Sequence, residues 1–190
     1  MPKLWEGTIQ AHRDAVRDAV IETTWQLARE HGLRSVTMSQ VAASVGIGRA
    51  TLYKYFPDVE AILLTGHERH VTRHLEHLQQ VGSQVGTPLE RLRAVLLEFA
   101  RICHDRGRHG TEELGALVHK PDSTRRAEEQ IHALITSLVQ AAADTGDIRR
   151  DLPPAELAQY CAHALAAAAA APDTAATERL VEVCLRGMNP

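Results

Sequence analysis

The chain has few aromatic residues and no long apolar run, and each deficit argues against a class of protein. Aromatic residues make up 4% of the 190 residues, and beyond residue 56 they are only Phe99 and Tyr160. The larger part of the chain therefore offers little material for an aromatic cage around a cationic ligand. No stretch approaches the roughly 18 uninterrupted apolar residues of a membrane span, and the N-terminal residues lack an apolar signal core. We expect a cytoplasmic protein with no membrane partner.

Cysteine is also scarce. Cys103, Cys161 and Cys184 are odd in number, far apart in the sequence and without a CxxC pair. This usage indicates reduced, buried thiols. A redox switch is the alternative interpretation.

The net charge is small, and its distribution divides the chain. The whole chain carries −3, yet residues 1–56 hold seven Lys/Arg against five Asp/Glu, whereas the remainder holds 14 against 19. A weakly basic head, net +2, therefore precedes an acidic body, net −5. This balance argues against indiscriminate coating of nucleic acid and favours binding through one local surface.

Residues 37–56 have the pattern of two short helices around a tight turn. Thr37 and Gln40 have the spacing of a capping box, which starts a helix. Apolar residues then recur on one face of that helix, and Gly46 follows them as a left-handed C-terminal cap. The pattern predicts a helix-turn-helix.

The second helix, expected over residues 48–56, has the chemistry of a DNA-reading element. Leu52 and Phe56 are spaced to be core, which leaves the polar side chains on the remaining surface. The two-helix segment contains two cations, Arg49 and Lys54, and no Asp or Glu, so it can approach phosphates without repulsion. A helix of this size fits the major groove. The alternative is a glycine-joined helix pair without a DNA role, as found in many bundles.

The stretch Gly32–Ile62 resembles the DNA-binding domain of the tetracycline-repressor (TetR) family. The resemblance implies an all-α protein of about nine helices. It implies a three-helix helix-turn-helix domain in residues 1–56 and a helical ligand-sensing and dimerisation domain in residues 57–190. It also implies a homodimer that represses by binding a palindromic operator in double-stranded DNA and is released by a small-molecule effector. The matching positions are Gly32, Thr37, Val41-Ala42, Gly46, Thr51-Leu52-Tyr53, Tyr55-Phe56 and Glu60.

Carried over position by position, the resemblance assigns two sets of DNA-binding residues. Those expected to hold the DNA backbone are Thr37 and Tyr53. Those expected to face bases or phosphates are Arg49, Ala50, Thr51, Lys54 and Tyr55.

The chain departs from the family at Val59, where a lysine usually grips a phosphate. The helix that starts near Asp58 still offers free N–H groups to a phosphate, although the Asp58 carboxylate would partly oppose it. We therefore expect the salt dependence of DNA binding to rest mainly on Arg49 and Lys54, helped by Lys3, Arg13 and Arg17.

Helix and turn signals continue along the body. Thr87 and Glu90 have the spacing of a second capping box, with Pro88 at the first helical position. Gly82 and Gly146 are expected to end helices, and a polar loop is expected at residues 105–110. The expected helices span residues 58–81, 87–104, 111–119, 123–145, 154–171 and 174 to just before 187.

Six consecutive alanines, Ala166–Ala171, have two interpretations. They are either helix filler, given the helix propensity of alanine, or a contact surface that lets helix axes approach closely. In the second interpretation, the last two helices pair with their twofold mates as a four-helix dimer interface. The other apolar residues expected there are Leu165, Leu180, Val181, Val183, Cys184 and Leu185.

The long linking helix carries four histidines on one face. His70 and His74 have a spacing that can chelate zinc, and His67 and His77 flank them. Two histidines do not make a site, and the charged neighbours describe a solvated helix. We therefore expect no metal there.

The resemblance places an effector cavity among the middle helices, although the same residues can be ordinary core. The shortage of aromatic residues favours a small apolar or weakly polar ligand. The scattered histidines His104, His109, His119 and His163 could each supply a polar group to such a cavity or be hydrogen-bonded structural residues. The candidate wall residues are Leu96, Phe99, Cys103, Leu114, Leu117, Val118, Leu134, Ile135, Leu138, Tyr160 and His163.

Other functional classes have weaker support. The sequence has no nucleophile motif, phosphate loop or metal-ligand set, so we expect no enzyme and no cofactor. The main alternative is a constitutive DNA-binding or protein-interaction regulator without a small-molecule ligand. An enclosed cavity would favour the sensor, and a solid body would favour the constitutive regulator.

Overall fold

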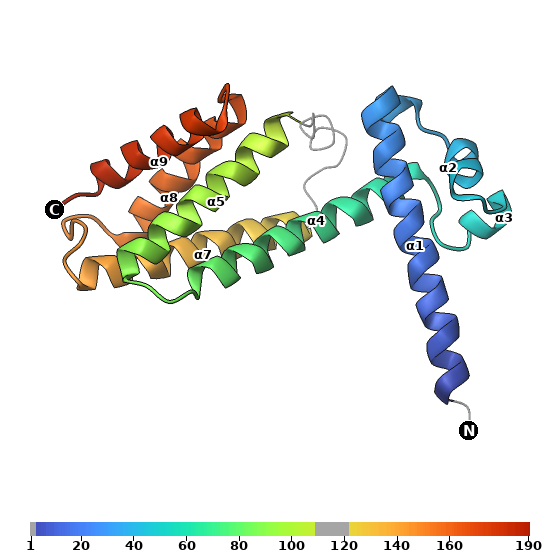
Figure 1. Ribbon diagram of the computed structural model, residues 1–190, viewed down its shortest axis with the longest axis horizontal. Coiled ribbons are helices and arrows are strands. Elements are labelled where there is room, and N and C mark those ends of the chain that lie inside the picture. Colours follow the sequence, from blue (N-terminus) through green and yellow to red (C-terminus); the bar gives the residue numbers. More distant parts are fainter. Residues whose placement is uncertain (1–2, 109–121) are drawn as a thin grey trace. The chain divides into compact units, whose positions relative to one another are not determined.

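The computed structural model describes residues 3–108 and 122–190, and every regular element within them is a helix (Figure 1). The predicted all-α class is confirmed. The chain divides into two compact units, Met1–His70 and Val71–Pro190. This division lies after the expected one at residue 56, because the first turns of the long helix α4 (Val59–Gly82) belong to the first unit.

The first unit contains α1 (Lys3–His31), the 3-10 turn η1 (Leu33–Ser35), α2 (Met38–Val45), α3 (Arg49–Leu52) and the beginning of α4. α2 contacts both α1 and α3, so the short helices are held on the long one. Each α-helix gives the core a fully buried side chain. These are Val20, Val41, Leu52 and Ile62, all with 0% exposure.

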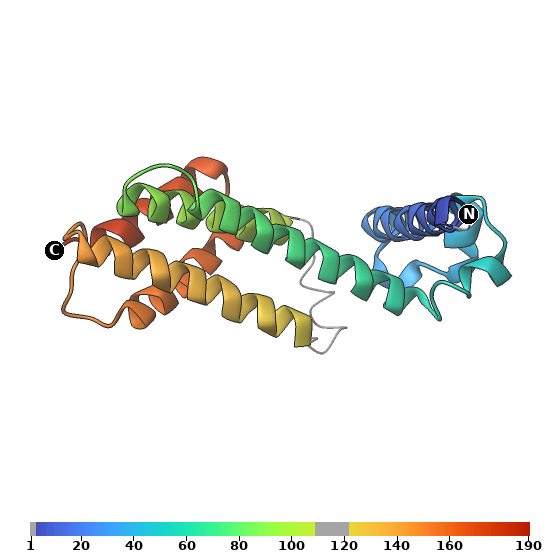
Figure 2. The ribbon, with the colours of Figure 1, turned by 90° about the horizontal axis from the view of Figure 1, so that it is seen from below.

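The second unit contains the rest of α4, α5 (Pro88–Arg108), α7 (Asp122–Asp144), α8 (Pro154–Ala166), the 3-10 turn η2 (Ala167–Ala170) and α9 (Thr174–Gly187). α5 contacts α7, α8, η2 and α9, and Figures 1 and 2 show these elements arranged around it. Its buried stripe, which includes Leu92, Val95 and Leu96, is therefore the centre of the core.

Cap chemistry fixes the helix ends in this unit as predicted. The backbone N–H of Thr87 donates to Glu90 Oε2 at 2.8 Å, and the N–H of Glu90 donates to Thr87 Oγ1 at 3.2 Å. The bonds from Thr87 hold the pKa of the Glu90 carboxyl below its usual value. α7 stops before Gly146, which adopts the left-handed φ of 80°.

The polar loop predicted at residues 105–110 is wrong as far as Arg108, because α5 remains helical to that residue, and residues 109 and 110 lie outside the described residues. The glycine that suggests a loop serves helix packing instead. A Cβ on Gly107 would lie 2.1 Å from the carbonyl oxygen of Ala169, so only glycine lets the η2 backbone approach α5 this closely. The helix predicted at residues 111–119 lies outside the described residues.

The single helix predicted over residues 154–171 is also wrong. The α-helix ends at Ala166, and the next residues tighten into the 3-10 turn η2, which packs on α5. Ala168 in this turn is fully buried. The alanine run therefore packs, at least in part, within its own chain.

None of the described helices combines the length and the apolar character that crossing a bilayer requires.

Candidate functional site

The start of α2 is fixed by the predicted capping box. Thr37 Oγ1 accepts the backbone N–H of Gln40 at 3.3 Å, and Gln40 Oε1 accepts the backbone N–H of Thr37 at 2.9 Å. Gly46 ends the helix with a φ of 77°, and the N–H of Ile47 donates to Ala42 O at 3.0 Å. Both ends of α2 are therefore set by local hydrogen bonds.

The second helix is shorter than predicted. Regular α-helix covers only Arg49–Leu52, and the following residues continue in tighter turns. Two helical bonds persist there, from Tyr53 N to Arg49 O at 3.0 Å and from Phe56 N to Leu52 O at 3.1 Å. Leu52 and Phe56 are 0% and 2% exposed, so both predicted core positions are buried together.

The residues predicted to face DNA lie on the surface around α3. We call them the reading face: the side chains of Arg49, Ala50, Thr51, Tyr53 and Lys54 are exposed, and that of Tyr55 is half-buried. Thr37, at the start of α2, is exposed as well. Residues 38–56 contain no acid, so the reading face has cations and hydroxyls with no carboxylate of its own segment beside them. Such a surface suits contact with phosphates and base edges.

Arg17 holds α1 to the end of this segment. Its guanidinium carbon lies 4.9 Å from the ring centroid of Phe56, which is cation–π geometry. Arg17 is half-buried, whereas Arg13 one turn earlier is exposed. Among the predicted helpers, Arg13 is therefore the more open to a phosphate, and the side chain of Lys3 lies outside the described residues.

The start of α4 has fewer free N–H donors for a phosphate than expected. Asp58 Oδ1 accepts the backbone N–H of Ala61 at 2.7 Å, so one of the free donors of this helix end is already used. Val59 begins the helix and brings no charge. The prediction that phosphate contacts rest mainly on Arg49 and Lys54 is consistent with this helix start.

The predicted ligand residues separate into two groups. Six of them pack in the core of the second unit: Leu96, Cys103, Ile135 and Leu138 are buried, and Phe99 and Leu134 are partly buried against them. Two others lie outside that core on α8: Tyr160 is 48% exposed and His163 is exposed. Leu117 lies outside the described residues, as do Leu114 and Val118.

All three cysteines are free and buried, and the thiols of Cys161 and Cys184 form a hydrogen bond with each other. Cys161 Sγ lies 3.6 Å from Met188 Sδ. A hydrogen bond with Cys184, together with burial, raises the pKa of Cys161. This pair was not predictable from sequence, because residues from two different helices meet only once α8 and α9 are packed.

The histidine face of α4 does not form a metal cluster within the part of the chain that the structure describes. His77 Nε2 lies 3.2 Å from Glu98 Oε1, and the other three histidines also have interaction partners.

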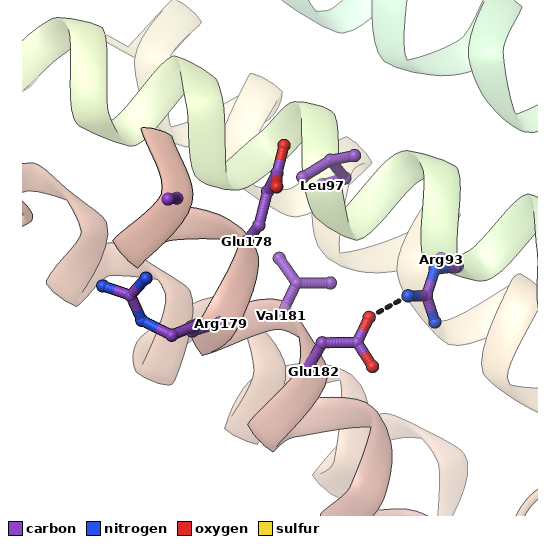
Figure 3. A pocket seen from close by; sticks show the side chains of 7 residues that line it. Arg93, Leu97, Glu178, Arg179, Val181 and Glu182 are labelled. Carbon is purple, nitrogen blue, oxygen red and sulfur yellow. Dashed lines mark hydrogen bonds and ion pairs between the residues drawn. The ribbon is translucent and has the colours of Figure 1, made fainter. Parts of the chain in front are cut away.

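A surface groove of about 390 Å³ lies between α5 and α9 (Figure 3). Its apolar residues are Leu97, Ala175 and Val181, and Arg93 and Glu182 form an ion pair at one side of it. The groove is open and contains none of the predicted ligand residues.

The outer face of α8 and α9 carries exposed apolar side chains. Val183 is 60% exposed, and Tyr160 lies near Gly187, whose Cβ would be 3.8 Å from the tyrosine oxygen. Most of the other residues predicted for a dimer interface face inward and are buried in their own chain. These are Leu165, Val181, Cys184 and Leu185.

Two comparisons of sequence cover both units. Residues 20–65 match the family described as bacterial regulatory proteins, tetR family. Residues 92–190 match the family described as transcriptional regulator SbtR-like, C-terminal domain. Uncharacterized HTH-type transcriptional regulators of Mycobacterium tuberculosis H37Rv and Mycobacterium bovis are 28% identical over 137 residues, which cover 68% of this chain and 63% of theirs.

Solved structures share the fold at lower identity. A TetR/AcrR-family regulator from Thermobifida fusca matches with a TM-score of 0.80 at 21% identity, covering 92% of this chain and 98% of that one. The regulator FadR from Bacillus subtilis, solved with stearoyl-CoA, matches with a TM-score of 0.70 at 15% identity, covering 90% and 98%.

Proposed function

Because the chain belongs to the TetR family of bacterial regulatory proteins, we propose that it is a transcriptional repressor that binds a palindromic operator as a homodimer and is released by a small effector. The observation that carries the proposal is the reading face. It presents exposed cations, hydroxyls and an aromatic ring on a capped helix pair whose segment lacks acids. The proposal places the protein with the chromosome, in the cytoplasm.

Some residues of the reading face position the protein on the DNA backbone, and others recognise the bases. Arg49 and Lys54 contact phosphates or, in the case of Arg49, a guanine edge in the major groove. Thr51 and Ala50 are short, so they approach base edges closely, and a thymine methyl is the apolar partner that Ala50 suits. Thr37 and Tyr53 hold the sugar–phosphate backbone on either side.

The dimer is proposed to form through the outer face of α8 and α9. A stripe of small and apolar residues follows one side of α9 at helical spacing: Ala176, Leu180, Val183 and Gly187. Tyr160 of α8 lies beside its end. Small residues let the helices of two protomers approach closely, and the twofold axis would then place two reading faces one DNA turn apart.

The effector is proposed to bind in the second unit and to stabilise a dimer whose reading faces no longer match successive major grooves. A coupling of about 1–3 kcal/mol is enough for release. FadR from Bacillus subtilis, which has this fold, was solved with stearoyl-CoA, so the fold can hold a ligand with a long apolar part. This supports the apolar character proposed for the effector here.

A constitutive regulator is the second candidate, and one observation favours it. The predicted wall residues Leu96, Cys103 and Leu138 are packed in the core at 0%, 1% and 5% exposure. The groove in Figure 3 is open rather than enclosed. A ligand that changes operator affinity would support the effector-responsive repressor over the constitutive regulator.

The proposal is tested by selecting DNA from a random-sequence pool with the purified full chain. The expected product is a family of palindromes bound by a dimer, and Arg49→Ala should lose the selected preference. Selection of no common sequence would contradict the proposal.

A further inference from the structure

The groove between α5 and α9 combines apolar surface with charged side chains (Figure 3). Leu97, Ala175 and Val181 line it together with two arginines and two glutamates. Its volume of about 390 Å³ is within the range of small-molecule sites. A ligand in the groove would meet apolar atoms and charges together, so its class depends on which of these charges are free to bind it.

The charged side chains of the groove differ in how firmly they are paired. Arg93 and Glu182 form an ion pair with each other. Glu178 has a much looser contact, 3.6 Å from its Oε1 to Arg101 Nη2, which is longer than a hydrogen bond. Arg179 is exposed and has no ion-pair partner among the described residues. One carboxylate and one guanidinium, neighbours on α9, are therefore available to a ligand.

The loose contact of Glu178 has a structural reason, because Arg101 is shared between two carboxylates. Arg101 Nη1 lies 3.5 Å from Glu98 Oε2, and Glu98 Oε1 in turn lies 3.2 Å from His77 Nε2. These contacts form a chain from α9 through α5 to α4. A ligand cation that took over Glu178 would leave Arg101 to Glu98 alone, so binding in the groove would change the contact that His77 makes.

The groove lies apart from the surface proposed for the dimer. Successive residues of an α-helix are rotated by about 100°, so Glu178, Val181 and Glu182 lie on a different side of α9 from the small and apolar stripe. The dimer contact proposed above therefore does not use the groove.

We propose that the groove binds a zwitterion with an apolar side chain, of which an apolar α-amino acid is the simplest example. The ammonium group pairs with Glu178, the carboxylate pairs with Arg179, and the side chain covers Leu97 and Ala175. A zwitterion fits because the two available charges are opposite in sign, whereas a simple anion or cation would match only one of them. The role as effector rests on the function proposed above and adds to it a ligand class and a route to α4.

Calorimetry with molecules of matched shape tests the ligand class. One set is leucine, 4-methylpentanoate, which lacks the ammonium group, and 3-methylbutylamine, which lacks the carboxylate. The other set is phenylalanine, 3-phenylpropanoate and 2-phenylethylamine. In at least one set, titrated into the full chain at neutral pH, the amino acid should bind about tenfold more tightly than either analogue, because each analogue loses one charged contact. No binding, or an analogue that binds as tightly as its amino acid in both sets, would overturn the proposal.

Variants assign each charge of the ligand to its partner. Arg179→Gln should lower the affinity for the amino acid to that for the amine, and Glu178→Gln should lower it to that for the carboxylate. Arg186→Gln is the matched control, because Arg186 is an exposed cation of the same helix that does not line the groove. If Arg179→Gln binds the amino acid like wild type, or Arg186→Gln loses as much affinity, the carboxylate is not held by Arg179.

A steric variant tests the place of binding. Ala175 lines the groove and is exposed, so a larger side chain there fills the groove without entering the core. Ala175→Trp should abolish binding of the amino acid and retain the circular dichroism spectrum of wild type. Undiminished binding would place the ligand elsewhere.

Operator binding on the same samples separates the effector role from DNA binding. The saturating amino acid should weaken operator binding of wild type by about fivefold or more. Glu98→Gln, which interrupts the chain to α4, should bind the amino acid as wild type does and lose this effect. Unchanged operator affinity in wild type would overturn the effector role. A wild type that binds no operator without ligand would contradict the proposed function instead, and calorimetry would still decide on the groove.

Discussion

The indole ring of Trp25 in α1 lies directly against the backbone of Gly66 in α4. A Cβ at position 66 would lie 2.0 Å from Trp25 Nε1 and 2.9 Å from Ile21 Cγ2. Glycine is therefore required for α1 and α4 to approach this closely within the first unit. The contact supports the scaffold on which the reading face is built.

Replacement of Gly66 by alanine should destabilise the first unit. The added methyl group overpacks the contact, so we expect a loss of about 1–3 kcal/mol in the free energy of unfolding, measured by circular dichroism in urea. The double variant Gly66→Ala with Trp25→Leu should lose less than the sum of the two single changes, because the ring that clashes is gone. Wild-type stability for Gly66→Ala would show that the two helices are not in close contact.

Lys54→Ala should reduce the salt dependence of operator binding. Each phosphate contact that is lost flattens the slope of log affinity against log salt by about one unit, and the dimer loses one contact in each half-site. Arg126→Ala is the matched control, since it removes an equal charge from an exposed position on α7 and should leave the slope unchanged. Equal slopes for Lys54→Ala and wild type would remove Lys54 from the phosphate contacts.

The two capping boxes should respond differently to acid. The folded-state pKa of Glu90 is lowered from 4.5 by the bonds from Thr87, so its contribution to stability is complete above pH 4.5 and is lost as the pH falls through the lowered value. Gln40, the corresponding residue of the α2 box, does not titrate. The stability difference between wild type and Glu90→Gln, from urea unfolding, should therefore change between pH 7 and pH 3. A difference that is independent of pH would contradict the role of the carboxylate.

Val183→Arg should weaken the proposed dimer and, with it, operator binding. The arginine would bring a charge into a twofold contact, where it meets its own copy. Val85→Arg is the control, because Val85 is also exposed but lies in the connection between α4 and α5. Sedimentation at micromolar concentration should show monomers for Val183→Arg only. If both variants remain dimeric, the interface lies elsewhere.

Local signals in the sequence predicted the helix caps well. Thr37 with Gln40, Thr87 with Glu90 and the glycine at position 46 each act on the backbone within a few residues, so their geometry follows from spacing alone. The burial of Leu52 with Phe56 follows for the same reason.

Contacts between distant segments were not predictable in this way. In the sequence, Gly107 indicates a loop. In the structure, it packs against the backbone of Ala169. The alanine run reads as α-helix, yet it tightens into η2 where it meets α5. Val181 and Leu185 were predicted to lie in a dimer interface but are buried in the core of their own chain. The reason is that an apolar stripe on a helix does not reveal which partner covers it.

The same distinction between local and distant contacts applies to the candidate site. The reading face is one short segment, so its exposure follows from a helical pattern around two core residues. The surroundings of His104, by contrast, depend on η2, because His104 Nδ1 lies 3.3 Å from the carbonyl oxygen of Ala168, more than sixty residues away in sequence. A sequence alone offers only a scattered histidine there.

We propose above that α3 and its flanking turns bind a palindromic operator. Footprinting of the intergenic DNA beside its own gene, with wild type and the Arg49→Ala/Lys54→Ala double variant, tests it most directly. We expect a protected palindrome whose half-site centres lie about one helical turn, ~34–36 Å, apart, and loss of that protection in the double variant. Protection of no specific sequence by wild type, or the same footprint from the double variant, would contradict it.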